Sequence, residues 1–310
     1  MSNRAGRKIK IMSGILRLVG LLLVLAGFGF WARPVSYLNG YSYLRFWMAG
    51  AESRSVTVSG HHIHYDVAGP KGGPVVVLVH GLSGRAENWQ SMAPYLVKAG
   101  YRVYMLDLLG FGRSEKPADF SYSVEDQAAI VAGALDALGL KRVDLGGWSM
   151  GGWIVQRVAI EHPERIRRLV LFDSAGLNEL PAWNTQLFTP ASIAELQQFE
   201  ALLMPHPPSL PDFISRDLLH NSEQNAWVVQ RALGTMLTGQ YTMDSLLPGL
   251  KMPVLIIWGT DDRIFPLRHA EVMHRLIPNS QLETFPGCGH LAPLQCASRI
   301  GPRVVEFLKQ

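Results

Sequence analysis

The 310-residue sequence contains only two cysteines and little charge, since Asp, Glu, Lys and Arg make up 17% of it. Two cysteines cannot form a disulfide framework, so a hydrophobic core must hold the fold. Apolar residues make up 48% of the sequence, which is enough for such a core and excludes a disordered chain. The net charge is only +4, and the basic residues cluster at the N-terminus alone. Nucleic acid is therefore not the expected partner.

The two cysteines, Cys288 and Cys296, lie on either side of His290. In an oxidising compartment they could form a bridge across that turn. The alternative is a pair of small, partly buried thiols. The sequence leaves both interpretations open.

The first 33 residues contain no acidic residue. A basic leader is followed by residues 11–32, a 22-residue stretch whose single charge is Arg17. This stretch is long enough to span a bilayer, and it is not followed by a typical signal-peptidase site. We expect residues 1–33 to form an uncleaved signal anchor and to bind membrane lipid, with residues 34–54 as a juxtamembrane linker. A cleaved signal peptide and a peripheral helix are the alternatives.

Aromatic residues beside this stretch suit a lipid–water interface; they are Trp31, Tyr37, Tyr41, Tyr43 and Trp47. The basic leader favours an N-terminus inside the cell and a catalytic domain outside it. Basic residues beyond the apolar stretch weaken that orientation; they are Arg33, Arg45 and Arg54. We expect a single-pass membrane protein with an extracytoplasmic domain.

From residue 55 onwards, strand and helix patterns alternate, which predicts a parallel sheet with helices on both faces. The expected strands are residues 56–58, 63–67, 74–79, 102–106, 142–145, 168–172, 254–258 and 281–285. The expected helices are residues 86–99, 123–138, 150–161 and 267–276, with a last helix at the C-terminus. The alternation stops at residues 177–246, where helical patterns at 192–204 and 222–238 are separated by prolines. We therefore predict a core of residues 55–176 and 247–310 with a helical cap inserted at 177–246.

The pentapeptide Gly147-Trp148-Ser149-Met150-Gly151 follows an apolar strand and opens a helix. On a sharp strand-to-helix turn, glycine on either side removes clashes that a Cβ would cause. A serine hydroxyl needs a base, a group that orients the base, and donors for the oxyanion. In this setting we predict that Ser149 is a nucleophile. The alternative is a structural glycine-rich turn.

Candidates for the oxyanion donors, the orienting acid and the base lie after the ends of predicted strands. The backbone N–H groups of Leu82 and Met150 could converge on one oxygen as an oxyanion hole. For the orienting acid we choose Asp262 over its neighbour Asp261, and Asp173 at the end of an earlier strand is a second candidate. His290, in the glycine loop after the last strand, is the predicted general base. Its alternative role is a surface histidine that caps a helix.

Other motifs have ordinary explanations. His62 and His64 alternate onto one strand face next to His61, but no third ligand is evident, so we expect no zinc. Gly110-Phe111-Gly112 lacks the third glycine of a dinucleotide fingerprint and is interpreted as a turn. His80 is expected to shape its loop rather than act as the base. No metal or cofactor is expected.

The combined motifs resemble the α/β-hydrolase superfamily over residues 56–310. They are His80-Gly81, the segment from Asp107 to Ser114, the Ser149 turn, the segment from Trp258 to Asp262, and Gly289-His290. The apolar leader and short cap are similar to membrane-anchored monoacylglycerol lipases and bacterial lipases and esterases. The resemblance implies a mostly parallel eight-stranded sheet flanked by helices, a helical cap and an N-terminal transmembrane helix.

This resemblance also implies Ser149 as nucleophile, Asp262 as acid, His290 as base, and Leu82 and Met150 as oxyanion donors. Serine at position 149 disfavours the dehalogenases and epoxide hydrolases of this fold. We expect hydrolysis of an apolar acyl ester, such as a monoacylglycerol, at a membrane. The same triad could instead cleave a carbon–carbon bond or an amide. A membrane-tethered binding protein without activity is a third hypothesis.

The predicted cap carries large apolar residues that suit an acyl chain, although packing within the cap is their alternative role. They are Phe188, Phe199, Met204, Phe213, Trp227 and Met236.

Overall fold

The computed structural model describes residues 18–20, 26–48, 50–179 and 181–310. Most of the predicted membrane anchor, residues 1–33, lies outside these ranges. Residues 18–20 and 26–32 are helical. Within the described ranges, no helix is both long and apolar enough to cross a membrane.

The core is one eight-stranded sheet in the order β1-β2-β4-β3-β5-β6-β7-β8. Strand β2 runs antiparallel to both of its neighbours, and all other pairs are parallel. The predicted mostly parallel eight-stranded sheet is confirmed. The strands are β1 (Glu52–Val58), β2 (His61–Ala68), β3 (Val75–Val79), β4 (Arg102–Leu106), β5 (Val143–Trp148), β6 (Ile166–Phe172), β7 (Val254–Gly259) and β8 (Ser280–Phe285).

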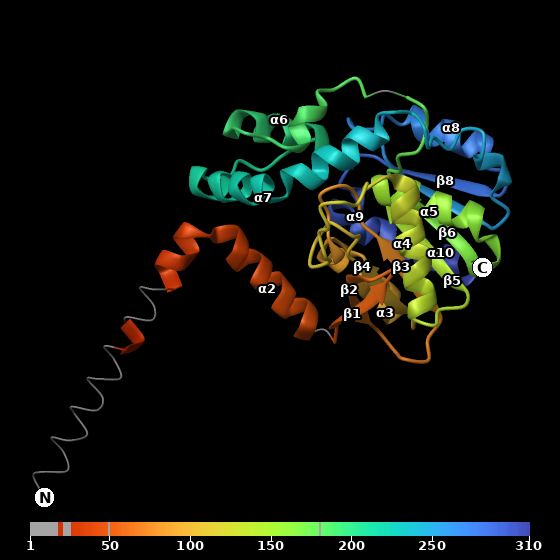
Figure 1. The fold of residues 1–310 in the computed structure, drawn as a ribbon, viewed down its shortest axis with the longest axis horizontal. Helices are drawn as coiled ribbons and strands as arrows, with labels where there is room; N and C mark the ends of the chain where they lie inside the picture. The colour runs from red at the N-terminus through yellow and green to blue at the C-terminus, as the bar shows by residue number, and fades with distance from the viewer. Residues whose placement is uncertain (1–17, 21–25, 49, 180) are drawn as a thin grey trace, which may run out of the picture.

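Helices cover both faces of the sheet, as Figure 1 shows. Along β3, Val77 and Val79 pack into one core cluster, while Val76 and Leu78 pack into the other. This alternation explains why β3 is a continuous apolar run, because both of its faces are buried. The first face carries α4 (Val124–Ala137), α5 (Met150–Glu161) and α8 (Arg268–Leu276). The second carries η1 (Ala86–Ser91), α3 (Ala93–Lys98), α9 (Ala292–Gln295) and α10 (Ala297–Lys309).

The inserted segment between β6 and β7 contains η3 (Thr185–Phe188), α6 (Ile193–Leu203) and α7 (Asp212–Met236), and η4 (Leu247–Gly249) follows it. Helix α7 begins at Asp212, ten residues before the start that the sequence predicted. The prolines that suggested an interruption end at Pro211, which occupies the N-cap position. Proline is compatible with a helix start because its φ is already near the helical value. The prolines therefore mark where α7 begins instead of breaking it.

Residues 34–54, interpreted from the sequence as a linker, contain the 15-residue helix α2 (Pro34–Met48) and the start of β1. Proline at the first position suits a helix start. Phe46 on α2 is buried in the same core cluster as Trp89 and Met92 of the domain. This packing fixes α2 against the domain, and Figure 1 shows α2 running beneath α7 towards β1.

Candidate active site

Ser149 lies on the turn between β5 and α5 with φ 56° and ψ −121°. A positive φ is costly for a residue with a Cβ and persists only where the surroundings enforce it. A Cβ on Gly147 would overlap the carbonyl oxygen of Gly151, and a Cβ on Gly151 would overlap those of Val79 and His80. The two glycines therefore allow the close packing that holds the Ser149 backbone in this conformation.

Two later loops bring a histidine and a carboxylate to this serine. His290 Nε2 lies 2.9 Å from Ser149 Oγ, and His290 Nδ1 lies 2.8 Å from Asp262 Oδ2. Their exposed fractions are 7% for Ser149, 3% for His290 and 5% for Asp262. Because the carboxylate can only accept, the neutral imidazole carries its proton on Nδ1 and leaves Nε2 free to accept from Ser149. The structure thus contains a buried Ser–His–Asp hydrogen-bonded chain.

Backbone groups fix both partners. The other oxygen of Asp262, Oδ1, accepts the N–H groups of Ile264 at 2.7 Å and Phe265 at 3.0 Å. The indole N–H of Trp148 donates to the carbonyl oxygen of His290 at 2.8 Å. The ring of Phe265 packs edge-on against the imidazole, with ring centres 5.5 Å apart. These contacts leave the imidazole little freedom to rotate.

The two amides predicted for the oxyanion hole lie next to the serine. Met150 is the first residue of α5, where an N–H has no acceptor within the helix. Leu82 follows Gly81, where an added Cβ would lie 3.0 Å from the Cβ of Ser149. The arrangement can therefore present backbone donors to an oxygen that develops charge beside Ser149 Oγ.

Among the described residues, Asp173, the second candidate for the acid, forms no hydrogen bond with His290. It is fully buried, and its Oδ1 accepts the N–H of Gly259 at 2.8 Å. Burial raises the pKa of Asp173, and the negative charge of Asp262 raises it further. Asp261 points instead towards Thr260 at the surface. The geometry favours Asp262 as the partner of His290.

Cys288 and Cys296 are joined by a disulfide in the structure. The sequence left a disulfide and a pair of free thiols open, and the structure contains the disulfide. It closes a short loop that contains His290. The bridge therefore constrains the segment that carries the imidazole.

A second Ser–His–Asp chain, which the sequence analysis missed, joins β1, β2 and the loop after β4. Ser53 Oγ lies 2.6 Å from His64 Nε2, and His64 Nδ1 lies 2.7 Å from Asp107 Oδ2. Ser53, however, lies within a regular strand, and its oxygen accepts a hydrogen bond from Arg113 at 3.0 Å. No local pattern could have revealed this chain, because Asp107 lies in a loop 43 residues beyond His64 and meets the β1–β2 hairpin only in the folded sheet.

Asp107 is the structural centre of this second chain. Burial opposes its ionisation, but hydrogen bonds from His64 and from the N–H groups of Arg113 and Ala86 hold its pKa below the ordinary value. A Cβ on Gly112 would overlap this carboxylate, which explains the glycine in the turn after Phe111. The hydrogen bonds to Asp107 therefore anchor the turn that contains Gly112.

His80 and His61 have partners of their own. The ring of His80 is buried between the carbonyl of Gly81 and the N–H of Leu108, and burial lowers its pKa. His61 contacts Glu115. Among the residues that the structure describes, no group of three or more side chains could hold a metal ion.

Two cavities lie near the Ser149 turn, although neither has Ser149 or His290 among its lining residues. One, of about 590 Å³, is a cleft between α2, the loop after Leu82 and the cap, with Ser83, Phe111, Phe188 and Phe199 among its lining residues. The other is small and mainly apolar, with Trp153, Trp183, Met236 and Phe265 among its lining residues. Both cavities are thus lined in part by aromatic and aliphatic side chains of the cap.

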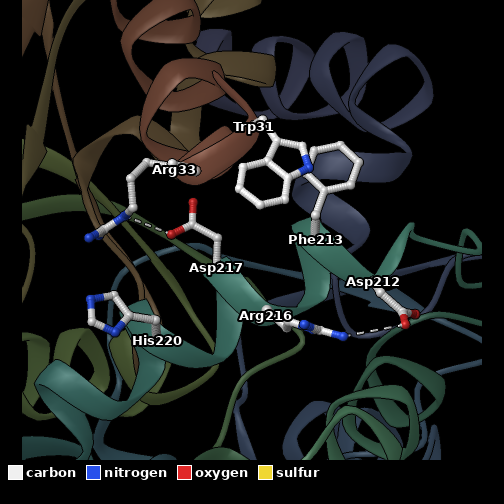
Figure 2. A pocket seen from close by; sticks show the side chains of 8 residues that line it. Trp31, Arg33, Asp212, Phe213, Arg216, Asp217 and His220 are labelled. Carbon is white, nitrogen blue, oxygen red and sulfur yellow. Dashed lines mark ion pairs between the residues drawn. The ribbon is translucent and has the colours of Figure 1, made fainter. Parts of the chain in front are cut away.

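A further hollow, of about 630 Å³, lies between residues 31–33 and α7 (Figure 2). Phe213 faces Trp31 there. Trp227 packs against Tyr122 at the surface, with ring centres 5.8 Å apart. Of the cap residues considered for an acyl chain, Phe188, Phe199 and Met236 line the two cavities beside the site.

Comparisons with known proteins support the alpha/beta fold described above. A family model of the alpha/beta hydrolase fold matches residues 74–295. A 2-hydroxy-6-oxononadienedioate/2-hydroxy-6-oxononatrienedioate hydrolase from Pseudomonas sp. is 31% identical over 264 residues, which cover 79% of this chain and 91% of the relative.

Two solved structures are also similar. A membrane phospholipase A described as a bacterial virulence factor has a TM-score of 0.82 at 28% identity, covering 96% of this chain and 98% of the other. The meta-cleavage product hydrolase from Pseudomonas fluorescens has a TM-score of 0.74 at 26% identity, covering 83% of this chain and 97% of the other. The family model spans most of the chain, and this chain therefore belongs to the alpha/beta hydrolase family.

Proposed function

We propose that this protein is a serine hydrolase that cleaves carboxylic esters with an apolar acyl group through an acyl-enzyme on Ser149. The observation that carries the proposal is the 2.9 Å contact between Ser149 Oγ and His290 Nε2. It occurs on a strained strand-to-helix turn with φ 56°. Nucleophilic serines in this fold need this strained backbone position together with an adjacent base.

In the first half-reaction, Ser149 Oγ attacks the ester carbonyl carbon while its proton moves to His290 Nε2. Asp262 stabilises the imidazolium that forms and keeps the proton on Nδ1. The N–H groups of Leu82 and Met150 donate to the oxyanion of the tetrahedral intermediate. The intermediate then expels the alcohol, which takes the proton from His290 Nε2. The product is an acyl group bound to Ser149.

In the second half-reaction, His290 Nε2 takes a proton from a water molecule that attacks the acyl carbonyl. The same N–H groups hold the second oxyanion. The carboxylic acid leaves as Ser149 Oγ recovers its proton from His290. The cycle consumes one ester and one water and returns the enzyme to its starting state.

The cavities favour an apolar acyl group. The small cavity is bordered by Trp153, one turn of α5 beyond Ser149, and by Trp183, Met236 and Phe265. Phe265 also contacts the His290 ring, so this cavity begins next to the base. An acyl chain placed there would bury aromatic and aliphatic surface, which is the main source of affinity for such ligands.

The proposal includes a membrane tether formed by residues 1–33, with the catalytic domain on the extracytoplasmic side. The apolar stretch at residues 11–32 and its basic leader support it. The Cys288–Cys296 disulfide is typical of an oxidising compartment and supports the extracytoplasmic side. The similar membrane phospholipase A is also named for a membrane location. Protease accessibility of the domain in intact cells tests the orientation.

A second candidate function is hydrolysis of a carbon–carbon bond in a dienone-type product by the same triad. It is favoured by the 31% identity to the 2-hydroxy-6-oxononadienedioate/2-hydroxy-6-oxononatrienedioate hydrolase. A series of p-nitrophenyl and glycerol esters of increasing chain length, assayed beside a dienone substrate, separates the two. Turnover of the dienone without turnover of any ester would favour the second candidate.

The two Ser–His–Asp chains provide a matched control for the nucleophile. A fluorophosphonate probe should label the full chain, Ser149→Ala should abolish labelling and ester turnover, and Ser53→Ala should retain both. Ser53 has a histidine at 2.6 Å, so proximity to an imidazole alone does not explain the difference. Labelling that survives in Ser149→Ala but disappears in Ser53→Ala would overturn the assignment. No labelling of folded protein at all would favour a binding protein without hydrolase activity.

A further inference from the structure

Nearly all of the exposed large apolar side chains among the described residues lie in one segment of the chain. Among the described residues, eleven of the twelve such side chains lie between positions 18 and 48, and the other is Trp227 on the cap. The eleven are Leu18, Val19, Phe28, Phe30, Trp31, Tyr37, Leu38, Tyr41, Leu44, Trp47 and Met48. Single exposed apolar residues need no explanation, but a concentration of this kind marks an interaction surface.

On α2, three of these side chains share one face of the helix. Tyr37, Leu44 and Met48 are spaced by seven and four residues, which places them on one face, and their exposed fractions are 46%, 48% and 72%. Trp47, 59% exposed, lies beside them. Phe46 lies on the opposite side and is buried in the domain core. Helix α2 therefore has a buried inner side and an apolar outer side.

The chemistry of the outer side fits a lipid–water interface. Tyrosine and tryptophan combine an apolar ring with a polar group and prefer the headgroup level of a bilayer. The sequence has no Asp or Glu before Glu52, but it has seven Lys and Arg residues in that stretch. The helix also follows directly on the apolar stretch at residues 11–32. A lipid surface with anionic headgroups matches the apolar, aromatic and basic character of this segment.

The N-terminal end of α2 is fixed to the cap through Asp217 of α7, which is 4% exposed. One oxygen of Asp217 accepts the N–H of Val35 at 2.8 Å, and the other pairs with Arg33 at 2.8 Å. Arg33 also donates to Asn221 at 3.0 Å. Figure 2 shows the Arg33–Asp217 pair beside Trp31 and Phe213. A buried carboxylate shared between two donors makes this a firm attachment.

The inner side of α2 borders the cleft beside the Ser149 turn. Val35, Ser36 and Asn39 line one wall of this cleft, and Ser83 and Phe111 line the part next to the predicted oxyanion loop. A lipid surface in contact with the outer side of α2 would therefore lie one helix diameter from the cleft. Helix α2 therefore lies between the proposed lipid contact and this cleft.

We propose that α2 lies in the plane of a lipid bilayer surface, with its outer side in lipid and its inner side forming a wall of the substrate cleft. Because α2 is attached to α7 through Asp217, this contact holds the cleft and the cap in a fixed orientation at the bilayer. The part of the proposal that concerns lipid substrates rests on the proposed ester hydrolysis. The contact itself does not depend on that activity.

The contact is tested by spin labelling of the full chain in lipid nanodiscs of phosphatidylethanolamine and phosphatidylglycerol. The only cysteines are joined in a disulfide, so Leu44→Cys introduces a single reactive thiol. Glu271→Cys on exposed α8 is the matched control. We expect the label at position 44 to be more accessible to oxygen than to a water-soluble nickel complex, with the opposite order at position 271. Equal behaviour at the two positions would overturn the proposal. So would spin–spin broadening at position 44, which would show that a second copy of the chain covers α2.

Activity provides an independent measurement. Leu44→Glu should lower the hydrolysis of a lipid ester embedded in the nanodisc by about tenfold or more, because a carboxylate is costly at an anionic interface. Its hydrolysis of soluble p-nitrophenyl butyrate should stay unchanged. Ala137→Glu, which adds the same charge at the exposed end of α4, should change neither rate. An equal loss on both substrates in Leu44→Glu would contradict the interfacial role. If the wild type hydrolyses no ester, the proposed function fails, while the accessibility measurement still decides the location of α2.

Discussion

Replacement of Asp262 by asparagine would move the proton on His290 from Nδ1 to Nε2 without changing the shape of the site. Asp262 Oδ1 accepts the N–H groups of Ile264 and Phe265, at 2.7 and 3.0 Å. In the variant, these two donors would hold the amide oxygen at that position, because turning the amide round would lose both bonds. The amide NH₂ would then face His290 Nδ1 and donate to it. Since a neutral imidazole has one proton, that proton would move to Nε2, facing Ser149.

The size of the effect follows from this geometry. Turning the amide would leave the buried N–H of Ile264 and the part-buried N–H of Phe265 without acceptors, at a cost of about 1–3 kcal/mol for the buried group. The wrong tautomer is therefore the favoured one, and it cannot take the Ser149 proton. The same exchange in the well-studied serine protease triad lowers kcat by roughly 10⁴. We expect a loss of about 10³ to 10⁴ in kcat, equivalent to roughly 4–5.5 kcal/mol in the activation barrier.

The assay is the steady-state hydrolysis of p-nitrophenyl butyrate, together with a thermal unfolding curve. Asp262→Asn should lose kcat with little change in KM or in melting temperature. Asp261→Asn, a neighbouring substitution at an exposed carboxylate, is the matched control and should behave like the wild type. A loss of less than about tenfold in Asp262→Asn would refute the argument. The acid role would then have to be sought at Asp173.

Three further predictions concern the frame of the site. Gly151→Ala places a Cβ against the carbonyl oxygens of Val79 and His80, so it should lower the free energy of unfolding by roughly 2 kcal/mol or more. A variant that unfolds at the same urea concentration as the wild type would contradict this prediction. The double variant Cys288→Ser/Cys296→Ser should lose about 2.5 kcal/mol of stability and part of its activity, because the bridge restricts a short loop that contains His290. Unchanged stability of the double variant would contradict this prediction. Burial and the charge of Asp262 raise the pKa of Asp173 above its ordinary 3.8, so the folded state binds the proton more tightly than the unfolded state. Stability is therefore full below about pH 3.8 and falls as pH rises towards the raised pKa. Asp173→Asn can keep the bond from Gly259 and should show a flatter stability profile from pH 4 to 8, whereas parallel profiles would contradict the shift.

The sequence predicted the sheet because its signals are local. A strand buried on both faces, such as β3, is apolar throughout, and a turn such as that of Ser149 needs small residues at fixed positions. Both signals are contained within a few consecutive residues. Helix boundaries were less secure where a proline has two interpretations, as at Pro211, which starts α7 instead of interrupting it. The helix at residues 34–48 was missed because its outer side is as apolar as its inner side, so no amphipathic pattern marks it.

What the sequence by itself determined is which residue types follow which strands: Ser149 on a glycine turn, with Asp262 and His290 after later strands. It favoured Asp262 as the orienting acid but left Asp173 as a second candidate, because both follow strands whose ends meet at the same edge of the sheet. Only the tertiary structure put Asp262 2.8 Å from His290 and left Asp173 buried against Gly259. The tertiary structure also brings Ser53, His64 and Asp107 into one hydrogen-bonded chain. It pairs Arg33 with Asp217 as well. Contacts of this kind depend on how distant segments pack together, and no local pattern of residues encodes that packing.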